Sequence, residues 1–261
     1  MYKNKRETDK VIKILAVGNS FSRNANTYLY DIAKSAGVEI KNVNLYIGGC
    51  PLSRHAQNIR EDRKNYELDF DGKPTGFFVS VKEALESDNW DFITVQQASH
   101  ESYDFEKYEP HLDFVADFVR SKCPDAKLGV HETWGYIDEK RLADNGFDSF
   151  NGMSEAILPC YKEAENRINA DFFIPSGEVM SAAVHAGLSV HASDGFHAGV
   201  LGCFMIGLAW FSVITGKSVT ENKITDIAGA DMRDIEKAAR ITAEIVEKHK
   251  KGQKIWSNRK R

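Results

Sequence analysis

Five short apolar runs recur along the chain, and stretches with helical spacing separate them. The runs occupy residues 11–17, 41–47, 91–95, 127–131 and 172–174. Each is almost wholly apolar, which is typical of strands covered on both faces, and their alternation with helices indicates parallel pairing. The pattern therefore predicts an α/β fold with a mainly parallel sheet between two layers of helices.

Helical spacing and turn residues fill the intervals between these runs. We expect helices over residues 26–37, 81–86, 105–122, 153–169, 198–215 and 235–248, with a kink at Pro159. Residues 66–74 predict a hairpin between the second and third strands, which either decorates the sheet or forms a wall of a substrate cleft. No repeat or linker interrupts the pattern. We therefore expect one domain over residues 11–250, a flexible tail over 1–10 and a basic tail over 251–261.

The charge balance and the cysteine pattern limit which partners and which cellular compartment are expected. Among 261 residues, 34 lysines and arginines stand against 38 acidic residues, a net charge of −4. This balance excludes a generally basic nucleic-acid binder, so nucleic acid is not expected as a partner. The four cysteines lack paired spacing and the N-terminus lacks a signal-peptide pattern. We therefore expect reduced thiols and a cytoplasmic protein.

One segment is apolar enough to suggest a membrane span. Residues 198–216 carry no formal charge, and about 20 apolar residues suffice to cross a bilayer. The segment is nevertheless rich in glycine and lacks flanking basic clusters. A helix buried against the sheet is the better interpretation, and no membrane is expected as a partner.

Glycines and polar residues follow the first two strands, where open parallel sheets carry their sites. After the first strand come Gly18, Asn19 and Ser20, and a serine on such a turn exposes its hydroxyl unless it only caps the following helix. After the second come Gly48 and Gly49, which suit either an oxyanion or a tight turn. Cys50, next to them, has no evident base nearby and is interpreted as a small inert apolar residue.

Two further blocks complete the set of candidate residues. The third strand runs into Gln96-Gln97-Ala98-Ser99-His100, where an amide suits an oxyanion and equally a plain polar rim. Far downstream, Asp194 precedes His197 by three residues. That spacing lets the carboxylate bind the imidazole and leave its other nitrogen free as a general base, although an aspartate there can also cap a helix.

The order of these blocks resembles the SGNH/GDSL hydrolase superfamily over about residues 11–216. Gly18-Asn19-Ser20 corresponds to its first block, Gly-Asp-Ser, with asparagine in place of aspartate. Gly49 matches the glycine of the second block, and Asp194 with His197 matches the last. The third block departs, because the family commonly has Gly-x-Asn-Asp where this chain has Gln96 to His100. The local sequence around these motifs is also similar to a bacterial branch of the superfamily known only as a domain of unknown function.

The resemblance implies both a fold and a chemistry. The fold is a three-layer α/β/α sandwich, flavodoxin-like, with a mainly parallel five-stranded sheet. The activity is that of a serine esterase or deacylase on small acyl esters, above all acetyl esters. Ser20 would attack the carbonyl, His197 would take its proton, and Asp194 would orient His197. The same fold also admits a catalytically inactive carbohydrate-binding or scaffold protein.

The remaining site residues follow from the same resemblance. We expect the oxyanion hole to consist of the N–H groups of Ser20 and Gly49 with the amide of Gln96 or Gln97. Substrate contacts are expected from Asn19, His100 and Trp134. Aromatic side chains near the site suit a sugar face or plain packing, so the substrate is a small-molecule or carbohydrate acyl ester. No metal and no organic cofactor is expected, and the oligomeric state is left open.

A different interpretation treats residues 18–22 as a phosphate cradle in a nucleotide-binding protein of flavodoxin type. The loop has no lysine after its glycine, and the chain has no Gly-x-Gly-x-x-Gly motif. Both absences weigh against nucleotide binding and favour the esterase.

Overall fold

A seven-stranded sheet forms the centre of the molecule. The computed structural model describes the backbone of residues 11–259 and the side chains of residues 11–250. The strands are β1 (Ile12–Gly18), β2 (Ile40–Tyr46), β3 (Tyr66–Phe70), β4 (Lys73–Val79), β5 (Phe92–Val95), β6 (Lys127–His131) and β7 (Phe172–Ile174). Their order across the sheet is β4-β3-β2-β1-β5-β6-β7. The tail expected over residues 1–10 lies outside the described residues.

The five apolar runs of the sequence form the parallel part of this sheet. β1 pairs in parallel with β2 and β5, and β5, β6 and β7 continue the parallel series. The expectation of a five-stranded sheet is wrong in one respect. The predicted hairpin adds β3 and β4, which pair antiparallel beside β2, so it extends the sheet.

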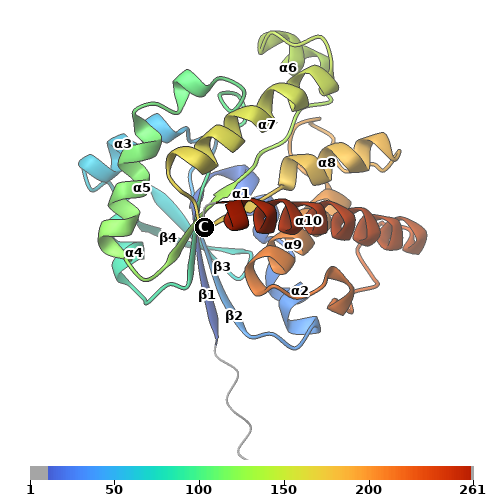
Figure 1. Ribbon diagram of the computed structural model, residues 1–261, viewed down its shortest axis with the longest axis horizontal. Helices are drawn as coiled ribbons and strands as arrows, with labels where there is room; N and C mark the ends of the chain where they lie inside the picture. Colours follow the sequence, from blue (N-terminus) through green and yellow to red (C-terminus); the bar gives the residue numbers. More distant parts are fainter. Residues whose placement is uncertain (1–10, 260–261) are drawn as a thin grey trace, which may run out of the picture.

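Helices cover both faces, which confirms the three-layer sandwich. They are α1 (Ser20–Asn26), α2 (Leu29–Ser35), α3 (Leu52–Arg60), α4 (Val81–Glu86), α5 (His111–Lys122), α6 (Glu139–Asp144), α7 (Phe150–Arg167), α8 (Ser176–His185), α9 (Val200–Thr215) and α10 (Met232–Arg259). Figure 1 shows α3, α4 and α5 on one side of the sheet and α2, α9 and α10 on the other, in agreement with their mutual packing.

The boundaries of several helices differ from the predicted ones for local reasons. The helix expected over 26–37 is the shorter α2, and a separate helix that was not expected, α1, precedes it directly after the first strand. The helix expected over 105–122 begins only at His111, after a 3-10 turn, because Pro110 lies just before α5. The last helix runs to Arg259, so residues 251–259 of the expected basic tail have helical backbone. Pro159 lies inside α7, as expected.

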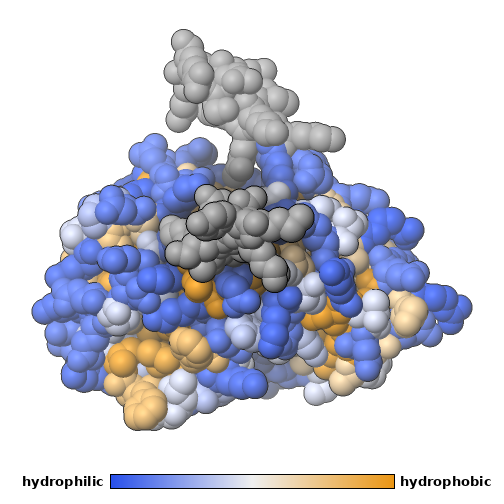
Figure 2. Space-filling view, turned by 90° about the horizontal axis from the view of Figure 1, so that it is seen from below, coloured by the Kyte–Doolittle hydropathy of each residue, from blue (hydrophilic) through white to orange (hydrophobic). Residues whose placement is uncertain are grey.

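The apolar segment near residue 200 is a buried helix, as predicted. Phe204, Leu208 and Trp210 of α9 are fully buried between the sheet and neighbouring helices. None of the helices in the described part of the chain is both long and apolar enough to cross a membrane. The face shown in Figure 2 is mainly hydrophilic, with small hydrophobic patches among the charged side chains.

Candidate active site

A cavity of about 430 Å³ opens among the loops that follow β1, β2, β5 and β6. It brings together residues from five separate parts of the chain. Its lining consists of Asn19, Ser20, Phe21, Tyr46, Gly48, Gly49, Ser99, His100, Tyr136, Arg141, Asn145, Phe196 and His197. Ser20, Gly49, His100 and His197, predicted from four distant blocks, therefore share one cavity.

Ser20 begins α1 immediately after the first strand. Asn19 caps the helix, because its extended backbone (φ −145°) turns the chain and its Oδ1 accepts from the N–H of Phe21 at 2.9 Å. Ser20 is only partly buried and lies in the first turn of the helix. The alternative that Ser20 only caps the helix is wrong, because Asn19 is the cap, and Ser22 Oγ accepts from the Asn19 N–H.

Gly18 is required by close packing behind this turn. A Cβ at this position would overlap Ser22 Oγ and would lie 3.1 Å from Gln96 Oε1. Any larger residue would therefore push apart the two groups that hold the turn. The glycine in the first block is explained by this close approach.

Two backbone N–H groups of residues on the cavity are suited to bind an anion. Those of Ser20 and Gly49 make no hydrogen bond to any described residue, although both residues line the cavity. Gly49 has a φ of +59°, a conformation that favours glycine, and nothing lies within 4 Å of the position of a Cβ. The glycine is thus explained by its backbone conformation in a tight turn, which leaves its N–H free.

Asp194 holds His197 through two hydrogen bonds and the preceding Phe196 through a third. Asp194 Oδ2 accepts from His197 Nδ1 at 2.7 Å, and its Oδ1 accepts from the backbone N–H groups of Phe196 and His197. Burial opposes the charge on Asp194, but these hydrogen bonds outweigh it and lower its pKa below the ordinary value. Because an ionised carboxylate only accepts, the proton of His197 is on Nδ1 and Nε2 is left free.

A buried chain of side-chain hydrogen bonds runs beneath Ser20. His131 Nδ1 lies 2.7 Å from Gln96 Oε1, Gln96 Nε2 donates to Asn19 Oδ1 at 2.7 Å, and Asn19 Nδ2 donates to the carbonyl of Cys50 at 3.2 Å. Burial lowers the pKa of His131 to about 3, so its ring is neutral and donates from Nδ1 to the amide oxygen. The chain ties the ends of β6, β5 and β1 to the loop after β2.

Neither Gln96 nor Gln97 lines the cavity. Gln96 is only 2% exposed, and its amide is bonded to Asn19 and His131. Gln97 accepts from the N–H of Leu52 and donates to the carbonyl of Lys107. The prediction that a glutamine amide completes the oxyanion hole is therefore not supported by the geometry, because both amides are consumed in holding loops together.

Trp134 does not line this cavity either, contrary to its predicted contact with substrate. Its ring stacks on Phe21 with centroids 4.1 Å apart, and its Nε1 donates to the carbonyl of Phe196 at 2.9 Å. Phe21 follows the candidate nucleophile and Phe196 precedes the candidate base. Trp134 thus supports both segments from behind, while Tyr136 from the same loop faces the cavity.

Cys50 is not a rival nucleophile. Its side chain is fully buried, and burial raises the pKa of the thiol to about 12. A thiol of this kind is protonated and inert, which agrees with the interpretation as a small apolar residue.

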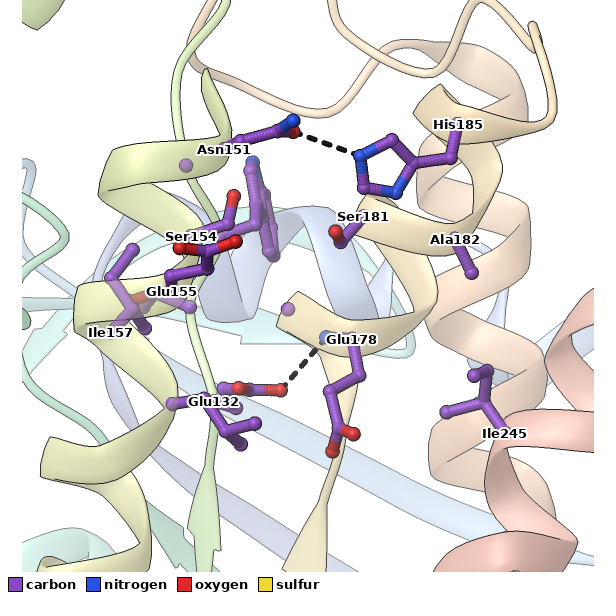
Figure 3. A pocket seen from close by; sticks show the side chains of 15 residues that line it. Glu132, Asn151, Ser154, Glu155, Ile157, Glu178, Ser181, Ala182, His185 and Ile245 are labelled. Atoms are coloured by element: carbon purple, nitrogen blue, oxygen red, sulfur yellow. Dashed lines mark hydrogen bonds between the residues drawn. The ribbon is translucent and has the colours of Figure 1, made fainter. Parts of the chain in front are cut away.

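Trp134 also forms one wall of a second cavity, of about 270 Å³, between α7 and α8. Figure 3 shows the Glu132 carboxyl lying between these helices, with one oxygen toward the backbone nitrogen of Glu178. Glu132 is 1% exposed, and burial with the nearby Glu178 carboxylate raises its pKa to about 8. The Glu132 carboxyl accepts a hydrogen bond from the backbone at the start of α8 and lies close to Gly177. These contacts explain Glu132 as a group that caps this helix.

Two polar residues of the first cavity could not be predicted from the sequence. Arg141 and Asn145 lie on and just after α6, a short helix in the long connection between β6 and α7. This connection is fixed to the loop of the candidate base, because the N–H groups of Ile137 and Asp138 both donate to the carbonyl of Gly195. Such a docking contact depends on the fold and leaves no local pattern in the sequence.

One solved structure resembles this chain in both sequence and fold, and others resemble it in fold alone. A DUF4886 family protein from Bacteroides uniformis ATCC 8492 is 29% identical, with a TM-score of 0.83 over 91% of this chain and 95% of that one. A putative SGNH hydrolase from Slackia heliotrinireducens is 20% identical, with a TM-score of 0.57 over 78% of this chain and 100% of that one. The psychrotrophic esterase EstA from Pseudoalteromonas sp. is 12% identical, with a TM-score of 0.52 over 78% and 97%.

The last two identities are low, so these likenesses concern the fold, and they confirm the predicted SGNH hydrolase architecture. None of the curated proteins compared with the chain matches it. The family model described as a domain of unknown function, DUF4886, matches residues 13–243. The chain therefore belongs to the DUF4886 family and has the fold of the SGNH hydrolases.

Proposed function

We propose that this protein is a carboxylic ester hydrolase that uses Ser20, His197 and Asp194. One observation carries the proposal: a serine at the start of a helix shares a cavity with a histidine whose other nitrogen is bonded to a carboxylate. A serine needs an adjacent base to become a nucleophile, and the base needs a group that fixes its tautomer. The SGNH hydrolase fold of the chain supports the same chemistry.

The proposed reaction proceeds through an acyl-enzyme. Ser20 Oγ attacks the ester carbonyl while His197 Nε2 takes its proton, and the same proton then passes to the departing alcohol. Water, deprotonated by His197, attacks the acyl-enzyme and releases the acid and the free serine. Ser20 Oγ makes no hydrogen bond to a described residue, so its rotation toward His197 is unhindered by other partners.

The oxyanion would be held by two backbone N–H groups. Those of Ser20 and Gly49 have no hydrogen-bond partner among residues 11–250, and both residues line the cavity. Loss of one oxyanion donor typically lowers kcat by about 10²–10³-fold. We assign Gln96 a positioning role, since it holds Asn19 and thereby the turn that presents the N–H of Ser20.

The substrate is proposed to be a short acyl ester, such as an acetyl ester. Four aromatic residues, Phe21, Tyr46, Tyr136 and Phe196, line the cavity, and aromatic side chains are suited to bind sugar rings. A carbohydrate ester is thus a suitable natural form. The small cavity favours a short acyl chain over a long one.

Hydrolysis of 4-nitrophenyl acetate tests the proposal. Wild-type protein should hydrolyse the ester, and Ser20→Ala should lower kcat by at least about 10³-fold. Ser121→Ala, an exposed serine on α5, is the matched control and should retain full activity. Equal turnover by wild type and Ser20→Ala would reject the assignment, and absence of turnover in the wild type would favour a binding or scaffold protein on this fold.

A further inference from the structure

Arg141 carries the one permanent charge among the side chains that line the cavity. Of the residues that line the cavity it is the one lysine or arginine, and no aspartate or glutamate accompanies it. Within the described part of the chain its guanidinium makes no ion pair and no hydrogen bond. Arg141 is exposed, so its guanidinium is available to a ligand that enters the cavity.

The side chain packs on Phe196, the residue that precedes the candidate base in the chain. Its Cζ lies 3.9 Å from the centre of the Phe196 ring, and the His197 ring centre lies 3.8 Å from the same ring. The backbone of its segment is fixed as well. Asp138 caps α6 by accepting from the N–H of Arg141, and the Asp138 N–H itself donates to the carbonyl of Gly195. Arg141 thus has a defined place relative to His197.

Its position indicates which half of the substrate it faces. In the proposed reaction, which this inference assumes, His197 hands a proton to the departing alcohol, whereas Gly49 holds the carbonyl oxygen. Arg141 lines the same cavity and packs on Phe196, the residue before His197, so it is assigned to the side of the alcohol. A guanidinium there binds a carboxylate by two parallel hydrogen bonds more readily than any neutral group.

We propose that the substrate is a short acyl ester of an alcohol that carries a carboxylate, and that Arg141 binds this carboxylate. The chemical class is an O-acylated hydroxy acid, of which an acylated acidic sugar is the carbohydrate form. The Tyr136 and Ser99 hydroxyls, bonded to each other at 2.6 Å and both on the cavity, lie where further hydroxyl groups of such an alcohol can be bound.

Two matched esters test the proposal. The probes are 4-acetoxybenzoate, which carries a carboxylate on its alcohol part, and its neutral methyl ester, each rate being normalised to hydroxide-catalysed hydrolysis. We expect wild-type protein to favour the anionic ester at least about tenfold in kcat/KM, a preference within the range of one charge-assisted contact. Arg141→Gln should bring the ratio close to one, and Arg141→Lys should give an intermediate value.

Lys140→Gln is the matched control, since Lys140 is exposed on the same helix and does not line the cavity. It should keep the wild-type ratio. Equal rates for both esters in the wild type, or a ratio that survives Arg141→Gln, would overturn the carboxylate subsite while leaving the esterase in place. Hydrolysis of neither ester, nor of 4-nitrophenyl acetate, would instead overturn the proposed function on which the subsite depends.

Discussion

Gln96 Nε2 donates a hydrogen bond to Asn19 Oδ1 at 2.7 Å, across 77 positions of sequence. The contact joins the end of β5 to the residue that caps α1 and precedes Ser20. Because Asn19 also donates to the carbonyl of Cys50, the loops after β1, β2 and β5 are fixed to one another. An asparagine serves here better than an aspartate, since it can donate to a carbonyl while accepting from an amide.

Replacing Gln96 tests this positioning role. Gln96→Met keeps the volume but leaves His131 Nδ1 without its acceptor and removes one of the two donors to Asn19 Oδ1, which should destabilise the fold by about 1–3 kcal/mol. Displacement of the Ser20 turn should also lower kcat about tenfold with little change in KM. Urea unfolding and ester kinetics measure the two effects, with Gln57→Met, at an exposed position on α3, as the control. A stability loss with unchanged kcat would show that Gln96 is structural only.

Asp194→Asn probes the orientation of His197. The amide can still accept from the backbone, but it no longer fixes the proton on Nδ1, so kcat should fall by on the order of 10²–10⁴-fold. Since the folded pKa of Asp194 is lowered, its stabilising contribution is present above about pH 4 and is lost as the pH falls through the folded pKa. The variant should therefore be less stable than wild type at pH 7, and the gap should close in acid. A gap that is constant with pH would contradict this.

Two glycines of the site should respond differently to alanine. Gly18→Ala forces Ser22 and Gln96 to move, and a loss of about 2–3 kcal/mol is expected by analogy with overpacked cores. Gly49→Ala meets no neighbour within 4 Å and costs only the left-handed backbone, about 1–2 kcal/mol. Urea midpoints of the two variants give the order. A larger loss for Gly49→Ala would show that the loop after β2 is packed more tightly than we describe.

Glu132→Gln should alter the pH dependence of stability. An unfolded glutamate titrates near pH 4.3, whereas Glu132 in the fold has a pKa of about 8. Between these values the unfolded chain releases a proton that the fold retains, so wild-type protein loses stability as the pH rises from about 4 to 8. The glutamine variant lacks this loss, and its stability relative to wild type should rise by about 2–4 kcal/mol between pH 5 and pH 8.

Glu163→Gln, at an exposed position on α7, is the control for this pH series. Its stability relative to wild type should not change between the two pH values. Parallel curves for wild type and Glu132→Gln would mean that the Glu132 carboxyl is ionised inside the fold at neutral pH.

Much of the sheet and the candidate catalytic residues could be predicted from the sequence. Strands buried on both faces are continuously apolar, so the five parallel strands are visible as runs. Residues at the carboxyl ends of such strands gather at one edge, which is why Ser20 and Gly49 share a cavity although they are far apart in sequence. His197 joins them from the loop between α8 and α9.

The remaining features depend on partners that no local pattern reveals. Gln96 and Gln97 look equivalent in sequence, yet one is bonded to Asn19 and the other to Leu52 and Lys107. Trp134 and Tyr136 are two residues apart, but the chain turns one toward Phe21 and the other into the cavity. Pairing of the hairpin with β2 likewise follows from the tertiary fold.

Covalent labelling of the nucleophile tests the central claim most directly. The protein would be treated with an alkyl fluorophosphonate and digested, and the modified peptide would be identified by mass spectrometry. The account predicts one adduct, on Ser20, formed rapidly by wild type and at least about 10²-fold more slowly by His197→Gln. An adduct on another residue, or labelling of Ser20 at the same rate without His197, would contradict it.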